Sequence, residues 1–168
     1  MLKLKEANFE DIEKEYYVIT NLQDNEFGFE NKYQNCTYEE FEKQILPTLI
    51  ANEKGLELPE GYVPGGYYFL YDNEEIIGLF KIRYFLNEYL KNGAGHVGYS
   101  ILKEHRKKGY ATKGLKLALN LCKTLVKEDE IYFSVHKNNP ASLKVIQKNG
   151  GYITHEDEKE YFVRIKKK

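Results

Sequence analysis

The segment His96–Thr112, with the sequence HVGYSILKEHRKKGYAT, constrains the fold more than any other part of the chain. It begins with alternating residues typical of a strand, continues through the basic run KEHRKKG, and leads into an amphipathic helix. The first turn of a helix leaves backbone N–H groups free, and a glycine lets a ligand approach the backbone closely. This order of elements therefore favours binding of an anion such as a phosphate. The alternative interpretation is a solvated basic turn.

Neither of two other phosphate-binding motifs occurs in the position that its function requires. The sequence contains no GxxxxGK[ST] motif and no GxGxxG motif after a candidate strand. Neither a P-loop nor a Rossmann dinucleotide site is therefore predicted. The basic loop before the helix remains the candidate anion site.

The remaining pattern predicts a mixed α/β chain with several consecutive strands in its middle. Thr37 followed by Glu40 is a capping-box signature, and Asn139 followed by Pro140 is typical of a helix start. We also expect Asn8 to cap a first helix. The expected helices begin at residues 9, 38, 110 and 140, a long loop covers residues 21–35, and strands cover residues 1–7, 67–71, 76–84, 96–102, 131–135, 151–154 and 161–165.

Length and composition favour a single domain over residues 1–168. Hydrophobic residues make up 42% of the chain, enough for a sizeable core, and no apolar stretch approaches the ~20 residues that cross a bilayer. Cys36 and Cys122 form neither a metal pattern nor a disulfide framework. The N-terminus lacks the apolar core of a signal peptide. We therefore expect a cytoplasmic, reduced protein with no bound metal and no membrane partner.

The near-neutral net charge of −1 conceals an asymmetry along the chain. Residues 1–60 carry 14 acidic and 6 basic side chains, whereas residues 61–168 carry 12 acidic and 19 basic ones. One part then favours cations nearby and the other favours anions. The isoelectric point of about 6.5 and the short basic run argue against nucleic acid as a partner.

Two segments of the chain resemble one known family. Arg106–Ala111, with the sequence RKKGYA, resembles the R/Q-x-x-G-x-G/A signature of the GCN5-related N-acetyltransferases (GNAT), with alanine where many members have glycine. The later run NNPASLKVIQKNGG is similar to the second recognisable segment of that superfamily. The order of elements agrees along nearly the whole chain, and the N-terminal third fits loosely. The resemblance implies an α/β (α+β) fold with a mixed, mostly antiparallel, splayed sheet flanked by helices.

The resemblance also implies that acetyl-CoA is the co-substrate. Its pyrophosphate would lie on the backbone amides of the basic loop, and its pantetheine arm would pair like an added strand beside a strand that carries a bulge, for which Gly98 is suited. A backbone N–H near Ile101 would then polarise the thioester carbonyl. The residues implied in cofactor binding are Ile101, Leu102, Lys103, Arg106, Lys107, Lys108, Gly109, Tyr110, Ala111, Thr112, Asn138 and Asn139.

Acetyl transfer to an amine requires a base for the nucleophile and a group that stabilises or protonates the leaving thiolate. His96 is the candidate base, since relatives often carry a glutamate at that position; a hydrogen-bonded structural histidine is the equal alternative, and His136 is a rival base. Many relatives have, at the position of Ile146, a tyrosine that acts as the general acid, and isoleucine cannot donate a proton. Ser142 is the candidate that stabilises the thiolate at a helix N-terminus, with helix capping as its alternative.

The resemblance combined with the charge asymmetry gives a functional hypothesis. We expect direct transfer, in a ternary complex, to a primary amine on a cationic small molecule or peptide, because the acidic part of the chain coincides with the acceptor side in this family. Several of the fifteen tyrosines fall on that side. The alternative is a non-catalytic acetyl-CoA-binding sensor. A homodimer is common in the resembling family, and nothing in these residues decides whether this chain forms one.

Overall fold

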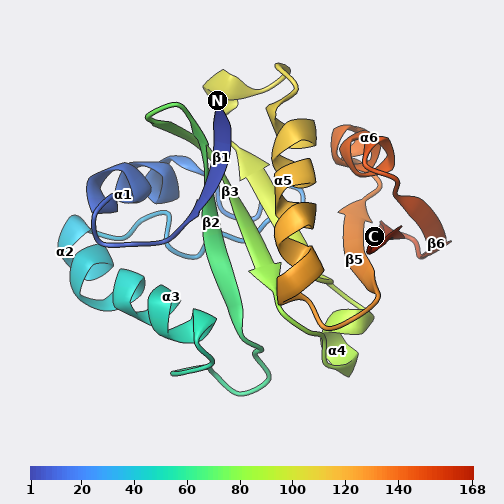
Figure 1. Cartoon of the computed structure of the whole chain (residues 1–168), viewed down its shortest axis with the longest axis horizontal. Helices are drawn as coiled ribbons and strands as arrows, with labels where there is room; N and C mark the ends of the chain where they lie inside the picture. Colours follow the sequence, from blue (N-terminus) through green and yellow to red (C-terminus); the bar gives the residue numbers. More distant parts are fainter.

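An antiparallel hairpin of β2 (Gly65–Asp72) and β3 (Glu75–Arg83) forms the centre of the larger of two sheets (Figure 1). The computed structural model describes all 168 residues. Most residues of both strands are buried, because helices cover both faces of the hairpin. The turn between them places Asn73 at φ +55, a left-handed conformation that asparagine tolerates. The two strands predicted around this turn are confirmed.

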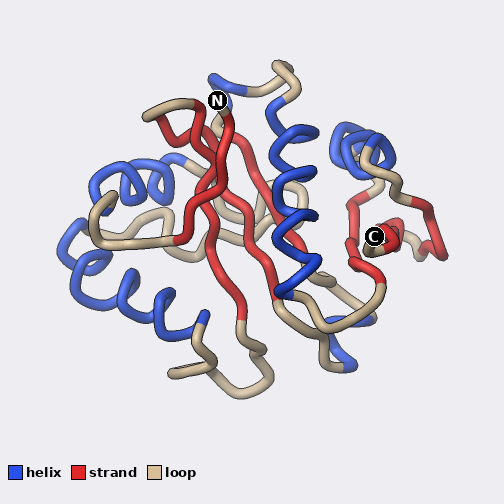
Figure 2. Tube along the Cα trace, viewed as in Figure 1, coloured by secondary structure: helices blue, strands red, loops and turns tan.

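The strands form two sheets that share one short junction (Figure 2). The four-stranded sheet has the order β1-β2-β3-β4 and the three-stranded sheet the order β5-β7-β6, and every pair of neighbours is antiparallel. The predicted mixed α/β fold with a mostly antiparallel, splayed sheet is thereby confirmed. The other strands are β1 (Leu2–Glu6), β4 (Val97–Ile101), β5 (Glu130–His136), β6 (Tyr152–Glu156) and β7 (Glu160–Lys166).

Helix α5 (Tyr110–Leu125) covers one face of the larger sheet and lies between the two sheets in the view of Figure 1. Its apolar side buries Leu115, Ala118 and Cys122 completely. Gly114 allows this close approach, because a Cβ there would lie 2.7 Å from the ring of Phe80 on β3. The predicted amphipathic helix is therefore present, and it fixes its own N-terminus beside the end of β4.

The other face of the larger sheet is covered by the N-terminal helices. Pro47 has no N–H to donate and lies in the first turn of α3 within the second helical segment, where a π-helical turn precedes it. Phe41 and Leu46 from this segment are fully buried. The helical elements are α1 (Ile12–Asn21), α2 (Tyr38–Glu40), η1 (Phe41–Ile45), α3 (Leu46–Glu53), α4 (Glu88–Lys91), η2 (Lys103–His105) and α6 (Pro140–Lys148). No helix is both long and apolar enough to span a bilayer.

The predicted helix starts at residues 38, 110 and 140 are confirmed, and the start predicted at residue 9 is shifted. Thr37 and Glu40 form both hydrogen bonds of a capping box. Asn139 Oδ1 accepts from the Ser142 N–H, 3.2 Å away, at the start of α6. At the first helix Asn8 Oδ1 instead accepts from the Asp11 N–H, so α1 begins three residues later than predicted.

The bulge predicted in the strand that contains Gly98 is not present. The pairing of β4 with β3 runs without a register shift from Val97 to Ile101. Shifts occur instead at Leu70/Tyr71 on β2 and at Ile153/His155 on β6. The sheet splays for a different reason: β4 and β5 pair only at the Gly95–Phe133 bridge, and no residue of either strand continues the ladder.

Candidate active site

The free edge of β4 is the first element of the site. In an antiparallel pair, both backbone polar groups of a residue point to the same side. The N–H of Leu102 donates to the carbonyl of Ile77 on β3, at 2.9 Å, so alternation turns the N–H groups of Tyr99 and Ile101 toward the opposite edge. No strand pairs with that edge. Beyond the Gly95 bridge it therefore offers peptide groups that an extended ligand can pair with.

A cavity of about 590 Å³ opens where β4 and β5 separate. It includes residues of both strands and of the loop between α1 and α2, and it reaches both faces of the sheet. Ligand sites of small-molecule enzymes have volumes of this order. The lining of the cavity includes Phe29, Glu30, Lys32, Tyr67, Lys81, Arg83, Gly98, Tyr99, Ser134, His136, Asn139, Ser142, Ile146 and Glu160.

The loop between β4 and α5 is the second element of the site. Lys107 has φ +62 and Gly109 φ +81, and these left-handed residues curve the backbone before the helix. The backbone N–H groups from Lys107 to Thr112 donate to no other group of the fold. These N–H groups lie at the N-terminal end of α5, a helix of 16 residues whose dipole favours negative charge at this end. The loop is thus a built anion cradle, and it fits the pyrophosphate of a nucleotide-linked thioester.

Some of the predicted cofactor residues expose their side chains at the cradle, and others direct their side chains into the protein. Lys107, Lys108 and Gly109 are exposed. Tyr110 turns away to donate to Asp72 Oδ2 at 2.7 Å, while Ala111 and Thr112 lie in the half-buried first turn of α5. These last three residues therefore contribute backbone to the cradle.

Arg106 is already engaged inside the protein. Its Nε donates to the carbonyl of Ile101 at 2.9 Å, and its Nη2 lies 2.5 Å from Glu26 Oε1 in the loop before α2. The arginine thus joins the end of β4 to that loop. Its side chain positions the strand edge rather than projecting free toward a phosphate.

The remaining predicted cofactor residues differ in what they can offer. Leu102 is buried and its N–H is used by β3, so it has no free donor for a ligand, whereas Lys103 is exposed. Asn138 is also exposed and does not line the cavity. Asn139 does line it, with its Oδ1 occupied by the cap of α6.

His96 lies at the junction of the two sheets and is fully buried. Its Nδ1 accepts from the N–H of Tyr132 at 2.9 Å, so its Nε2 carries the proton and donates to Glu128 Oε2, also at 2.9 Å. Burial lowers the pKa of this imidazole, although the hydrogen bond to Glu128 opposes the shift. No ring nitrogen is left for a substrate. The geometry thus contradicts His96 as the base and supports the structural alternative.

Ser142 is hydrogen-bonded to Tyr99, a residue that the sequence analysis did not identify as a candidate. The hydroxyl of Tyr99 on β4 lies 2.8 Å from Ser142 Oγ in the first turn of α6, and both residues line the cavity. Burial raises the pKa of Tyr99 to about 12, so the phenol keeps its proton at neutral pH. The available signal was strand alternation, which places Tyr99 two residues before Ile101 with its N–H on the same edge.

His136 and Ile146 also lie at the cavity. His136 Nε2 is 3.5 Å from Glu160 Oε1, and the ring packs against Gly28, where a Cβ would lie 2.6 Å from Nε2. Imidazole is the side chain best suited to accept a proton near neutral pH. Ile146 is buried, so no acid occupies its position. Tyr99 is the phenol that the structure places at the cavity end of α6.

The charges at the cavity differ from those expected from the sequence. Among the acidic residues of positions 1–60, Glu30 is the one that lines it. Lys32, Lys81 and Arg83 line it as well, and Glu160 belongs to the C-terminal part of the chain. The acidic character of the N-terminal third therefore lies mostly on other surfaces.

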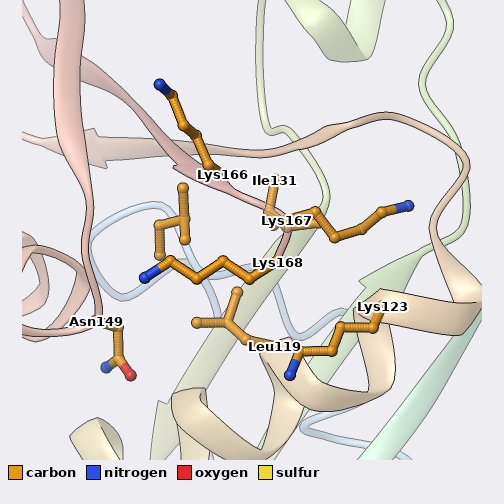
Figure 3. A pocket seen from close by; sticks show the side chains of 8 residues that line it. Leu119, Lys123, Ile131, Asn149, Lys166, Lys167 and Lys168 are labelled. Atoms are coloured by element: carbon orange, nitrogen blue, oxygen red, sulfur yellow. The ribbon is translucent and has the colours of Figure 1, made fainter.

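A second cavity, of about 140 Å³, lies between α5 and the end of β7. Lys123 and the three C-terminal lysines line it. Figure 3 shows Lys166 and Lys167 pointing in opposite directions, and Lys167 Nζ donates to the carbonyl of Val126 at 2.7 Å. These ammonium groups do not converge on one point, so the larger cavity is the candidate site. No cluster of His, Cys, Asp and Glu side chains is placed to hold a metal ion.

A free strand edge, an anion cradle at a helix start and a cavity between splayed strands together define an acyl-CoA-type transferase site. The sequence matches the family profile described as the acetyltransferase (GNAT) domain over residues 4–151. The chain therefore belongs to the GNAT acetyltransferases, which confirms the predicted family and enzyme class.

Solved structures with low sequence identity share the fold. Spermidine N-acetyltransferase from Vibrio cholerae, in complex with CoA and spermine, is 18% identical with a TM-score of 0.70, over 99% of this chain and 95% of that one. The Campylobacter jejuni N-acetyltransferase PseH, in complex with acetyl coenzyme A, is 20% identical with a TM-score of 0.60 over the full length of both chains. RimL, a ribosomal L7/L12 alpha-N-protein acetyltransferase, is 14% identical with a TM-score of 0.62, over 97% of this chain and 88% of that one. A search of curated proteins gave no significant match.

Proposed function

We propose that the protein transfers the acetyl group of acetyl-CoA to a primary amine within a ternary complex. The observation that carries this proposal is the free edge of β4, which joins the unpaired N–H groups of residues 107–112 to the cavity. Acetyl-CoA supplies an activated thioester. The N–H of Ile101 is placed on the edge where it can donate to a developing oxyanion.

The transfer exchanges one bond for another and needs two proton movements. The amine nitrogen bonds to the thioester carbonyl carbon, the C–S bond breaks, the amine loses a proton and the thiolate gains one. His136, held by Glu160, is the side chain at the cavity suited to accept the first proton. The Tyr99 hydroxyl, bonded to Ser142, is suited to give the second.

Direct transfer is favoured because no cysteine is available as an acyl carrier. Neither Cys36 nor Cys122 lines the cavity. Burial raises the pKa of both thiols, that of Cys122 to about 12, so neither provides a thiolate at neutral pH.

Thiol release from acetyl-CoA with pooled primary amines, together with mass spectrometry of the amines, tests the proposal. We expect one thiol for each acetylated amine, and initial rates that require both substrates at once. A non-catalytic sensor would bind acetyl-CoA, measured by calorimetry, and release no thiol with any pool. That outcome would replace the enzyme by the sensor alternative.

Substitution of His96 separates its structural role from a catalytic one. We expect His96→Ala to lower the free energy of unfolding by about 2–4 kcal/mol, because it leaves a cavity and removes the partners of Tyr132 and Glu128. Urea unfolding measures this loss. The folded variant should keep the wild-type pH dependence of kcat/KM, and loss of the acidic limb, which reports protonation of the base, without destabilisation would contradict the assignment.

A further inference from the structure

Lys81 and Arg83 are two cations of the cavity without a carboxylate partner. They occupy alternate positions of β3, so both side chains lie on the face covered by the N-terminal helices. No carboxylate oxygen lies within 4.0 Å of either one. Each donates to a backbone carbonyl instead: Lys81 to Glu30, and Arg83 Nη1 to Gly95 at 3.1 Å. Most of their N–H groups are left free, since an ammonium has three and a guanidinium five.

The surroundings of Lys81 leave its charge incompletely compensated. The side chain is half-buried between two aromatic rings, with Nζ 4.6 Å from the ring centre of Phe29 and 5.1 Å from that of Tyr67. Burial and the nearby charge of Arg83 lower the pKa of Lys81 to about 8. Two cations held together in a partly dry cavity repel each other, and a bound anion removes that cost.

These cations lie beside the free edge of β4. Lys81 pairs directly with Gly98, so their side-chain positions share one face about 5 Å apart. Gly98 has no side chain, and a Cβ there would meet only the edge of Phe29, at 4.0 Å. An anion held by Lys81 and Arg83 is therefore one strand away from the place where Tyr99 and Ile101 present their N–H groups.

We infer that Lys81 and Arg83 form an acceptor subsite for an anionic group, and that the acceptor is an amine that also carries a carboxylate or a phosphate. This inference rests on the proposed function, and it replaces the purely cationic acceptor expected from the sequence. Glu30 and Glu160 also line the cavity, and the charge of Glu30 acts on both cations, but neither carboxylate lies within 4.0 Å of Lys81 or Arg83, so no direct ion pair occupies the subsite.

Matched pairs of amines test the subsite. The pairs are phosphoethanolamine with ethanolamine, β-alanine with propylamine, and lysine with cadaverine; they differ by the anionic group and cover short and long spacers. Calorimetry in the presence of coenzyme A measures binding without turnover, and thiol release from acetyl-CoA measures kcat/KM. We expect at least one anionic member to bind at least tenfold more tightly than its partner, and the favoured pair tells carboxylate from phosphate.

The variants Lys81→Met and Arg83→Met remove one charge each while keeping a long side chain. We expect each to reduce the preference for the anionic member at least tenfold and to leave acetyl-CoA affinity unchanged. Lys116→Met, an exposed position on α5, removes the same charge away from the cavity and should keep the wild-type preference. Unfolding midpoints identify any variant that has lost its fold.

The outcomes separate this inference from the proposed function. Equal or weaker binding of the anionic member in every pair overturns the subsite, whatever the rate of thiol release. An unchanged preference in both methionine variants overturns it as well. Selective binding of an anionic amine that both variants abolish supports the subsite even without acetylation, whereas absence of thiol release with every amine tested counts against the transferase alone.

Discussion

Gly109→Asp should weaken acetyl-CoA binding on the order of 100-fold, equivalent to about 2.8 kcal/mol. Gly109 has φ +81 and stands at the start of α5, where the backbone N–H groups have no partner within the protein. An aspartate there adds a negative charge at the point where the cradle would hold a pyrophosphate. Calorimetric titration with acetyl-CoA, and with CoA to avoid turnover, measures the change.

Gly150→Asp is the matched control for this substitution. Gly150 also has a left-handed backbone, with φ +93, and at both glycines a Cβ would meet no atom within 4 Å. Both variants therefore bear a similar backbone strain and the same new charge, but Gly150 follows the end of α6 and is not part of residues 107–112; the neighbouring Asn149 donates to the carbonyl of Thr112, which leaves the N–H groups of the cradle free. Equal loss of affinity in the two variants would show that strain or net charge, rather than the cradle, controls binding.

Tyr99→Phe should lower kcat by about 100- to 1,000-fold while the dissociation constant of acetyl-CoA stays within about twofold of wild type. The phenol is the proposed proton donor; it is hydrogen-bonded to Ser142 at the cavity, and its raised pKa of about 12 keeps it protonated. Without it the thiolate leaves unprotonated, so chemistry slows while binding persists. Single-turnover kinetics with a saturating amine measure the chemical step.

Tyr68→Phe is the control for the loss of a tyrosine hydroxyl from the fold. The hydroxyl groups of Tyr68 and Tyr84 are hydrogen-bonded, with their oxygens 2.7 Å apart, and neither residue lines the cavity. Both substitutions should cost about 1 kcal/mol of stability, as a lost hydrogen bond does. Full kcat in Tyr99→Phe would remove the tyrosine from the mechanism, whereas a smaller loss in Ser142→Ala would fit a serine that orients the phenol.

The parts of the fold predicted from the sequence depend on residues close together in the chain. The capping box of Thr37 and Glu40 and the Asn139–Pro140 start of α6 each involve residues within three positions. The strand, loop and helix from His96 to Thr112 form one continuous segment. Because these signals are local, their meaning does not change with the tertiary arrangement.

The parts that could not be predicted depend on contacts between distant residues. Tyr99 and Ser142 are 43 positions apart, and His96 is 32 positions from Glu128. The alternation of His96 with small residues is the same whether its ring nitrogens face a cleft or another sheet. The pattern therefore does not distinguish a catalytic base from a structural histidine. The count of charges over residues 1–60 did not predict the charge of the cavity lining for a similar reason, because it does not say which side chains turn toward the cavity.

The gap between β4 and β5 has a thermodynamic consequence. The protein leaves one position in its sheet system without a strand, and the proposed function fills that position with the extended arm of a substrate. Ligand that binds only the native state at 100 times its dissociation constant adds about 2.7 kcal/mol to the free energy of unfolding. Under the proposed function, the free energy of unfolding therefore rises with the concentration of acetyl-CoA, because acetyl-CoA binds the native state at this position.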